Sequence, residues 1–171
     1  EGSLGSKILG ESVATFNEPW AISFIDENRL IVTTKPGKMW LVNTLGTVTE
    51  IENMVNVEYG GHGGLGDVVP HPDYKNNQYI YFSYIASEDG GNTRYAVVDR
   101  ALLRDLNSPK LENIERIWEQ FPAIQDTGHF AHRIAFGPEG SDHENKIFIT
   151  SGDRNVYTSA QLWDTNFGKI I

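Results

Sequence analysis

The sequence predicts an all-β protein made of antiparallel sheets that are arranged as the blades of a β-propeller. Short runs rich in β-branched and aromatic residues alternate with tight-turn residues along the chain. No apolar stripe with the period of a helix extends beyond two helical turns. Three similar segments also recur at spacings near the length of a propeller blade.

The strand pattern appears in separate runs, and turn residues stand between them. In the first third of the chain the turns are supplied by Asp26-Glu27-Asn28, Pro36-Gly37 and Thr44-Leu45-Gly46. The later runs have the same β-branched and aromatic composition, so we expect strands there too. The expected strands cover residues 20–25, 29–34, 38–42, 79–84, 94–98, 133–136 and 146–150.

The repeat suggests how these strands are grouped. Similar segments open at Pro19, Leu65 and His132, so their first residues are 46 (65 − 19) and 67 (132 − 65) positions apart. A four-stranded blade takes about 40–50 residues, which gives about three blades with long inserts at 52–64 and 120–131. A generic β-sandwich is the alternative architecture.

Three blades do not close a propeller, which needs about four to eight. We therefore interpret residues 1–171 as a single domain that forms the N-terminal portion of a β-propeller. The remaining blades are expected in cis or on a second chain, because an open propeller leaves sheet faces without partners.

The composition argues against several classes of function. The formal net charge of −9 disfavours nucleic acid and anionic membrane surfaces as partners. Without cysteine, the chain has no disulfide, no thiolate metal site and no cysteine nucleophile. No apolar run reaches the roughly 18 residues of a membrane span, and residues 1–5 lack the features of a signal peptide.

A histidine and an aspartate at the ends of two expected strands are the main candidates for catalysis. His129 stands shortly before the run at 133–136, and Asp153 follows the run at 146–150. If these strands are antiparallel neighbours, both side chains lie at one edge of the sheet. A histidine held by a carboxylate can take a proton from a hydroxyl at neutral pH. In the alternative interpretation, His129 closes a turn and Asp153 caps a loop.

A glycine-rich segment precedes the second unit. Gly61 to Gly66 matches GxGxxG formally, but residues 67–72 contain two prolines and cannot begin the helix that a dinucleotide site needs. We expect a crowded loop in which the glycines permit positive φ angles. His62 is the chemical group that this loop would bring to a ligand.

Three further features are interpreted as structural. Arg133 is expected to form an ion pair, and His132, which alternates with Phe130 and Ile134 along the strand, is expected to be packed rather than catalytic. The segment 142–145 is expected to be a solvated turn rather than a metal site, because its spacing does not match an EF-hand. The chain contains neither HExxH nor GxSxG, so zinc-protease and hydrolase motifs are absent.

Several segments, taken in order, resemble the soluble glucose/sorbosone dehydrogenases. The resemblance spans nearly all of the chain and about half of a typical member, and it implies a six-bladed propeller that uses pyrroloquinoline quinone and calcium. The matching segments are Pro19-Trp20-Ala21-Ile22, residues 34–38, residues 63–74, residues 76–81, Gly128-His129-Phe130-Ala131-His132-Arg133, Thr150-Ser151-Gly152-Asp153-Arg154 and Gly168-Lys169-Ile170.

The resemblance also implies roles for four residues. His129 matches the family's catalytic base, and Asp153 matches the acidic residue that holds this base. His62 and Arg154 are expected near the substrate or cofactor. No metal ligand is expected within this chain, because the family's calcium ligands and most of its quinone-binding arginines lie in later blades.

The sequence departs from the family pattern at three positions. His62 stands where a glutamine is usual, Gly128 replaces an acidic residue seen in some members, and His132 occupies the place of a glycine. A neutral histidine at position 62 can donate or accept one hydrogen bond there, but it cannot do both at once. His132 is expected to crowd the approach to the sheet end.

The function expected from these observations is oxidation of the C1 hydroxyl of an aldose sugar, with hydride transfer to pyrroloquinoline quinone. The family places such enzymes in the periplasm or outside the cell, and the sequence does not identify the sugar or the electron acceptor. Two alternatives from other classes remain: a non-catalytic propeller that serves as a binding module, and a calcium-dependent lactonase-like hydrolase.

Overall fold

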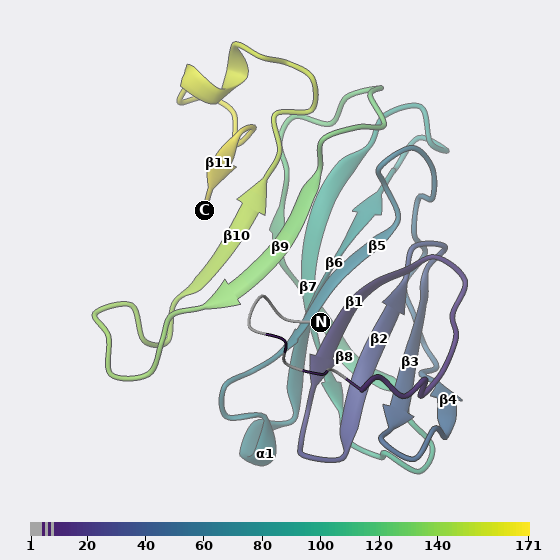
Figure 1. Cartoon of the computed structure of the whole chain (residues 1–171). Helices are drawn as coiled ribbons and strands as arrows, with labels where there is room; N and C mark the ends of the chain where they lie inside the picture. The colour runs from purple at the N-terminus through teal and green to yellow at the C-terminus, as the bar shows by residue number, and fades with distance from the viewer. Residues whose placement is uncertain (1–4, 6, 8) are drawn as a thin grey trace.

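The computed structural model describes residue 5, residue 7 and residues 9–171, and the strands of this part form three antiparallel sheets (Figure 1). Their first strands begin at Pro19, Leu65 and Ala131, close to the predicted openings of the three blades. The strands are β1 (Pro19–Phe24), β2 (Arg29–Thr34), β3 (Lys38–Asn43), β4 (Val48–Glu50), β5 (Leu65–Pro70), β6 (Tyr79–Ala86), β7 (Tyr95–Leu103), β8 (Leu111–Glu119), β9 (Ala131–Phe136), β10 (Ile147–Ser151) and β11 (Lys169–Ile170).

Each sheet follows the order of the chain. The first sheet has the order β1-β2-β3-β4, the second β5-β6-β7-β8, and the third β11-β10-β9. Antiparallel neighbours of this kind need only short connections. At the turn between β2 and β3, Gly37 adopts a φ of 109°, and its amide donates to the carbonyl of Thr34 at 2.9 Å. The predicted Pro-Gly turn is thus confirmed.

The sheets lie side by side through their first strands. β1 contacts β5, and β5 contacts β9, so the inner strands of the three sheets are neighbours (Figure 1). One apolar cluster, which includes Ile31 and Phe82, fills the space between the first and second sheets. A second cluster joins Tyr81 on β6 to Ile149 on β10. The all-β propeller class is confirmed by this arrangement.

A buried carboxylate fixes the second sheet to the third. Asp67 on β5 accepts a hydrogen bond from the amide of Ile134 at 3.0 Å and another from Nη1 of Arg133 at 3.2 Å. Asp67 is 5% exposed, so these contacts satisfy a charge that would be costly to bury alone. Arg133 is therefore an ion-pair partner, as its place in the sequence predicted.

Helices are minor elements of the fold. The helix α1 (Tyr74–Asn77) is a single turn after β5, and η1 (Ser159–Gln161) is one 3-10 turn. Within the described residues, neither is long or apolar enough to cross a membrane. The functional consequence of the fold lies in its loops: the segments before β5, before β9 and after β10 all meet at one end of the sheets.

Candidate active site

His129 and Asp153 form a hydrogen-bonded pair at this end of the sheets. β9 and β10 are antiparallel neighbours, with Ser151 opposite Ala131. His129 precedes β9 and Asp153 follows β10, so their side chains meet, with 2.8 Å between Nδ1 and Oδ1. The side chains remain 46% and 31% exposed, which leaves the pair open to a ligand. The juxtaposition predicted from the two strands is present.

The proton within this pair lies on the histidine. The hydrogen bond from His129 lowers the pKa of Asp153, and the backbone amide of Asn155 acts in the same direction. An ionised carboxylate can only accept hydrogen bonds, so Nδ1 of His129 must carry the shared proton. Its Nε2 then holds a lone pair, and no described residue donates a hydrogen bond to it.

Close backbone contact fixes the distance between the two loops. The amide of Gly152 donates to the carbonyl of Phe130 at 3.1 Å. A β-carbon at position 152 would lie 1.6 Å from the carbonyl oxygen of His129, so only glycine fits there. His129 itself has a φ of 49°, a strained conformation of the kind that clusters at functional sites.

Asp126 organises the loop that carries His129, and it was not among the residues predicted from the sequence. Its Oδ1 accepts hydrogen bonds from the amide of Gly128 at 2.6 Å and from Nδ2 of Asn155 at 2.9 Å. The first of these bonds is the main cause of its lowered pKa. The Asp-x-Gly spacing is typical of such a turn and was the available sequence signal. Asp126 Oδ1 also lies 3.1 Å from the β-carbon that another residue at position 128 would carry.

His62 lies beside His129. The two imidazole rings are stacked, with centroids 5.8 Å apart and an interplanar angle of 9°. The amide of His62 donates to the carbonyl of Thr127 at 2.8 Å, which ties the glycine-rich loop to the loop before β9. A β-carbon at Gly61 would lie 2.6 Å from that same carbonyl oxygen, and Gly61 has a φ of 57°. The loop therefore needs glycine at this position.

His132 packs beneath the site, in agreement with the prediction that it is a core residue. It is 4% exposed, and its ring meets Trp20 of the first sheet edge-on at a centroid distance of 5.6 Å. Burial lowers the pKa of its imidazole to about 4. The expected crowding of the sheet end is relieved by Gly66, because a β-carbon there would lie 2.4 Å from Nδ1 of His132.

Arg154, which is expected near the substrate or cofactor, lies buried against the loop that carries His129. Its exposed fraction is 0%, and its guanidinium lies under the loops that carry His129. Burial lowers its pKa to about 10. None of the described carboxylates forms an ion pair with it. A buried charge is unusual, and the sequence contains no signal for it.

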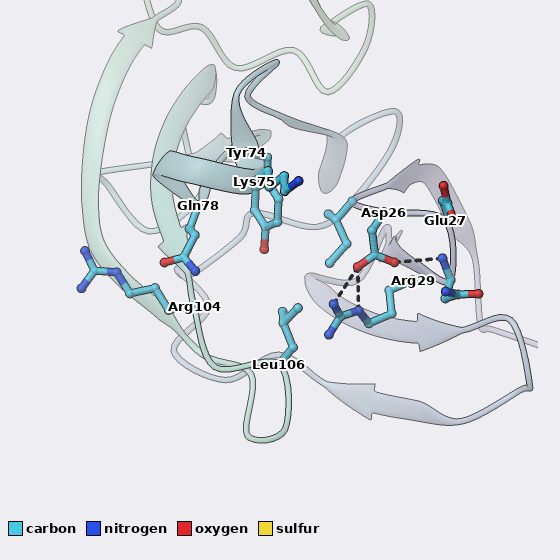
Figure 2. Close-up of a pocket in the computed structure, with 10 residues that line it drawn as sticks. Asp26, Glu27, Arg29, Tyr74, Lys75, Gln78, Arg104 and Leu106 are labelled. Atoms are coloured by element: carbon cyan, nitrogen blue, oxygen red, sulfur yellow. Dashed lines mark hydrogen bonds and ion pairs between the residues drawn. The ribbon is translucent and has the colours of Figure 1, made fainter.

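The other conspicuous groups lie away from this site. A cavity of about 820 Å³ lies near α1, beyond the opposite end of β5 from His62, and its lining includes Tyr74 and Gln78. Figure 2 shows the Asp26–Arg29 ion pair at one side of this cavity. Residues 142–145 form the exposed turn that was expected. Among the described residues, no group of three or more potential ligands could hold a metal ion.

The fold and the paired loops define a propeller-type protein with a histidine–aspartate site, and comparison with known proteins identifies its family. The family model for glucose/sorbosone dehydrogenase matches residues 16–171. The chain therefore belongs to the glucose/sorbosone dehydrogenase family.

Two curated relatives give the same family. The chain is 29% identical over 158 residues to the aldose sugar dehydrogenase YliI of Escherichia coli (strain K12), covering 91% of this chain and 40% of that protein. It is 28% identical over 163 residues to quinoprotein glucose dehydrogenase B of Acinetobacter calcoaceticus, covering 90% of this chain and 32% of that protein. The chain thus spans well under half the length of these relatives.

Solved structures agree with the fold. The apo form of the soluble aldose sugar dehydrogenase from Escherichia coli superposes with a TM-score of 0.80 at 28% identity, covering 91% of this chain and 43% of that chain. The aldose sugar dehydrogenase from Streptomyces coelicolor in its PQQ-bound form gives a TM-score of 0.80 at 23% identity, covering 96% and 47%. At 23% identity, the similarity to the Streptomyces coelicolor structure supports the fold alone.

Proposed function

We propose that this chain contributes the catalytic base of an enzyme that oxidises the C1 hydroxyl of aldose sugars. The observation that carries the proposal is the His129–Asp153 pair, which combines a 2.8 Å hydrogen bond with exposed side chains at the loop end of the sheets. Family membership supports an oxidation of sugars over other uses of a histidine–aspartate pair.

His129 takes the hydroxyl proton in this proposal. Its Nδ1–H is held by Asp153, so Nε2 presents a lone pair to a hydroxyl group. As the proton arrives, the imidazole becomes a cation, and the ionised carboxylate of Asp153 stabilises this charge. General-base catalysis of such a proton transfer contributes about 100-fold to 10,000-fold in rate.

His62 supplies a complementary group. The amide of His129 donates to Nδ1 of His62 at 3.3 Å, so the neutral His62 ring carries its proton on Nε2. The two stacked rings thus offer one acceptor, on His129, and one donor, on His62. A polyhydroxylated substrate has hydroxyl groups that match both, which supports a sugar as the ligand.

The cofactor in this proposal is pyrroloquinoline quinone, which accepts the C1 hydride when it is bound. Its carboxylates and carbonyls require cations and hydrogen-bond donors. At this end of the sheets, Lys35 and His62 have that chemistry, and Nζ of Lys35 donates to the carbonyl of Gly61 at 2.5 Å. These two residues would hold one side of the cofactor. The relative named as a quinoprotein supports this choice.

Calcium has no fitting ligand set among the described residues, so its ligands would come from other blades. The proposal also places the protein in the periplasm or outside the cell and requires an electron acceptor of unassigned identity. Residues 1–171 would act as one domain within a larger propeller, with the other blades completing the cofactor site.

The test is His129→Ala in the intact protein with pyrroloquinoline quinone and calcium supplied. We expect aldose-driven dye reduction to fall about 100-fold or more, since the general base is lost. His143→Ala is the matched control, because His143 lies in the exposed turn at 142–145. Dye reduction that survives within about tenfold of the wild-type rate would remove the assignment of His129 as base.

A further inference from the structure

We propose that Arg154 is a positioning residue that holds His129 in reach of Asp153, through a buried network of neutral oxygen acceptors. This inference rests on the proposed function of His129 and deepens it. Arg154 follows Asp153 directly in the chain, so the same turn places the carboxylate at the surface and the guanidinium in the interior of the protein.

The guanidinium binds oxygen atoms from three separate segments. Nε donates to the carbonyl of Gly128 at 3.0 Å, and Nη1 donates to the carbonyl of Arg94 at 3.0 Å. Nη1 also donates to Oε1 of Gln120 at 2.9 Å, and Nη2 donates to the carbonyl of Asp126. Two of these acceptors, the carbonyls of Asp126 and Gly128, lie in the segment just before His129, so one side chain ties the His129 loop to the residue before β7 and to the residue after β8.

An aromatic ring completes the enclosure. The guanidinium carbon lies 3.7 Å from the centroid of the Phe130 ring, which is itself 1% exposed. Phe130 is the residue after His129, so Arg154 contacts the chain on both sides of the base. A planar guanidinium has five N–H donors in a fixed fork, and this geometry matches acceptors that lie in several directions.

The network continues to the strand that carries Asp153. Nε2 of Gln120 donates to Oγ of Ser151 at 2.9 Å and to the carbonyl of Gly152 at 3.3 Å. Gln120 therefore links Arg154 to Ser151 at the end of β10 and to Gly152, the residue directly before Asp153. Both members of the catalytic pair are held by the same buried network, and its loss would let the two loops separate.

Two properties distinguish this arrangement from an ordinary surface arginine. Arg154 is fully buried, and its bonds go to neutral oxygens rather than to a carboxylate. A charge buried in this way is retained only when several hydrogen bonds satisfy it. Lysine has a single nitrogen and cannot reach acceptors on three segments at once, so Arg154→Lys keeps the charge and removes the fork.

The first readout needs no cofactor. The Nδ1–H proton that His129 shares with Asp153 gives a low-field proton resonance, assigned by its absence from His129→Ala. We expect Arg154→Lys to abolish or broaden this resonance in cofactor-free protein, while circular dichroism shows a folded chain. Arg116→Lys is the control: the guanidinium carbon of Arg116 also lies near an aromatic ring, 6.0 Å from the centroid of Tyr84, but Arg116 binds the carboxylate of Asp99 within the second sheet. An unchanged resonance in Arg154→Lys would overturn the inference.

The second readout separates positioning from general stability. We expect Arg154→Lys to lower kcat about 100-fold with little change in KM, the size of loss that a misplaced catalytic group causes. In the His129→Ala background the same change should have an effect within about twofold, because the residue it positions is gone. An equal loss in both backgrounds would show that Arg154 does not act through His129.

A milder variant keeps the inference testable if Arg154→Lys does not fold. Gln120→Leu removes one acceptor of Arg154 and leaves the other three in place. We expect it to broaden the His129 resonance and to lower kcat about tenfold, and an unchanged resonance and rate would overturn the inference. If His129→Ala remained active, the proposed base would be wrong, yet the resonance would still report whether Arg154 positions the pair.

Discussion

The backbone amide of His129 donates a hydrogen bond to Nδ1 of His62, and this contact determines which nitrogen of His62 carries its proton. Because Nδ1 must accept, Nε2 is left as the donor that can reach a ligand. On His129 the situation is reversed, since its Nδ1–H is held by Asp153. The backbone and a carboxylate together set the two rings in complementary states.

The two nitrogen positions of His62 can be tested separately. The amide of glutamine reaches as far as Nε2 of histidine, whereas the amide of asparagine reaches as far as Nδ1. If the outward donor contacts the substrate or cofactor, His62→Gln should retain more kcat/KM than His62→Asn, by about fivefold to tenfold for one hydrogen bond. Steady-state kinetics with several aldoses measures this. The opposite order would mean that His62 serves only to hold the loop.

Asp153→Asn tests the role of the carboxylate. The amide has nearly the same shape, but it no longer requires the proton to lie on Nδ1 of His129, and it cannot stabilise an imidazolium. We expect kcat to fall about 100-fold or more with the fold intact. Asp142→Asn, in the exposed turn before β10, is the control. Wild-type kcat in Asp153→Asn would contradict the proposed pair.

Gly152→Ala should damage the site through the backbone. The new methyl group would lie 1.6 Å from the carbonyl oxygen of His129, so one of the two loops must move. We expect a loss of unfolding free energy of about 3 kcal/mol or more, together with loss of activity. Gly10→Ala is the control, since nothing lies within 4 Å of its β-carbon. Equal denaturation midpoints for the two variants would refute the close contact.

His132 should make the protein less stable in mild acid. Its folded-state pKa of about 4 is below the usual 6.5 of histidine, because burial disfavours the charged ring. The unfolded chain therefore binds more protons between these values, and stability falls as the pH drops through this window. From pH 7 to pH 5 the loss is about 2 kcal/mol.

His132→Gln cannot titrate, so its unfolding free energy should change less over the same pH range. Denaturant titrations of both proteins at the two pH values measure the difference. His143→Gln, in the exposed turn, should keep the wild-type dependence on pH. A wild-type slope in His132→Gln would place the acid sensitivity elsewhere in the protein.

The sequence predicted the strands that border the apolar interior better than it predicted the outer strands of each sheet. The openings near Pro19 and Leu65 were found because apolar runs follow turn residues. β8 (Leu111–Glu119) was missed, since it contains three glutamates and an arginine and most of its residues face solvent. β4 (Val48–Glu50) was missed because three residues carry too little pattern. An outer strand does not need to alternate apolar and polar residues when neither of its faces is fully buried.

The site was predictable where strand geometry determines it. Antiparallel pairing of β9 and β10 follows from their short connection, and it brings His129 to Asp153. The burial of Arg154 could not be predicted, because charged residues are exposed by default and its acceptors come from segments up to 60 positions away. Only the folded chain brings these carbonyl groups together.

The contact between Gly66 and His132 has a consequence for how related sequences vary. The imidazole fills the volume that any side chain at position 66 would need, so the two sites cannot enlarge independently. We expect correlated substitution: homologues with a bulkier residue at 66 should carry a small one at 132, and those with an aromatic ring at 132 should keep glycine at 66. Positions 66 and 132, which lie where the three blades meet, should therefore vary together rather than independently.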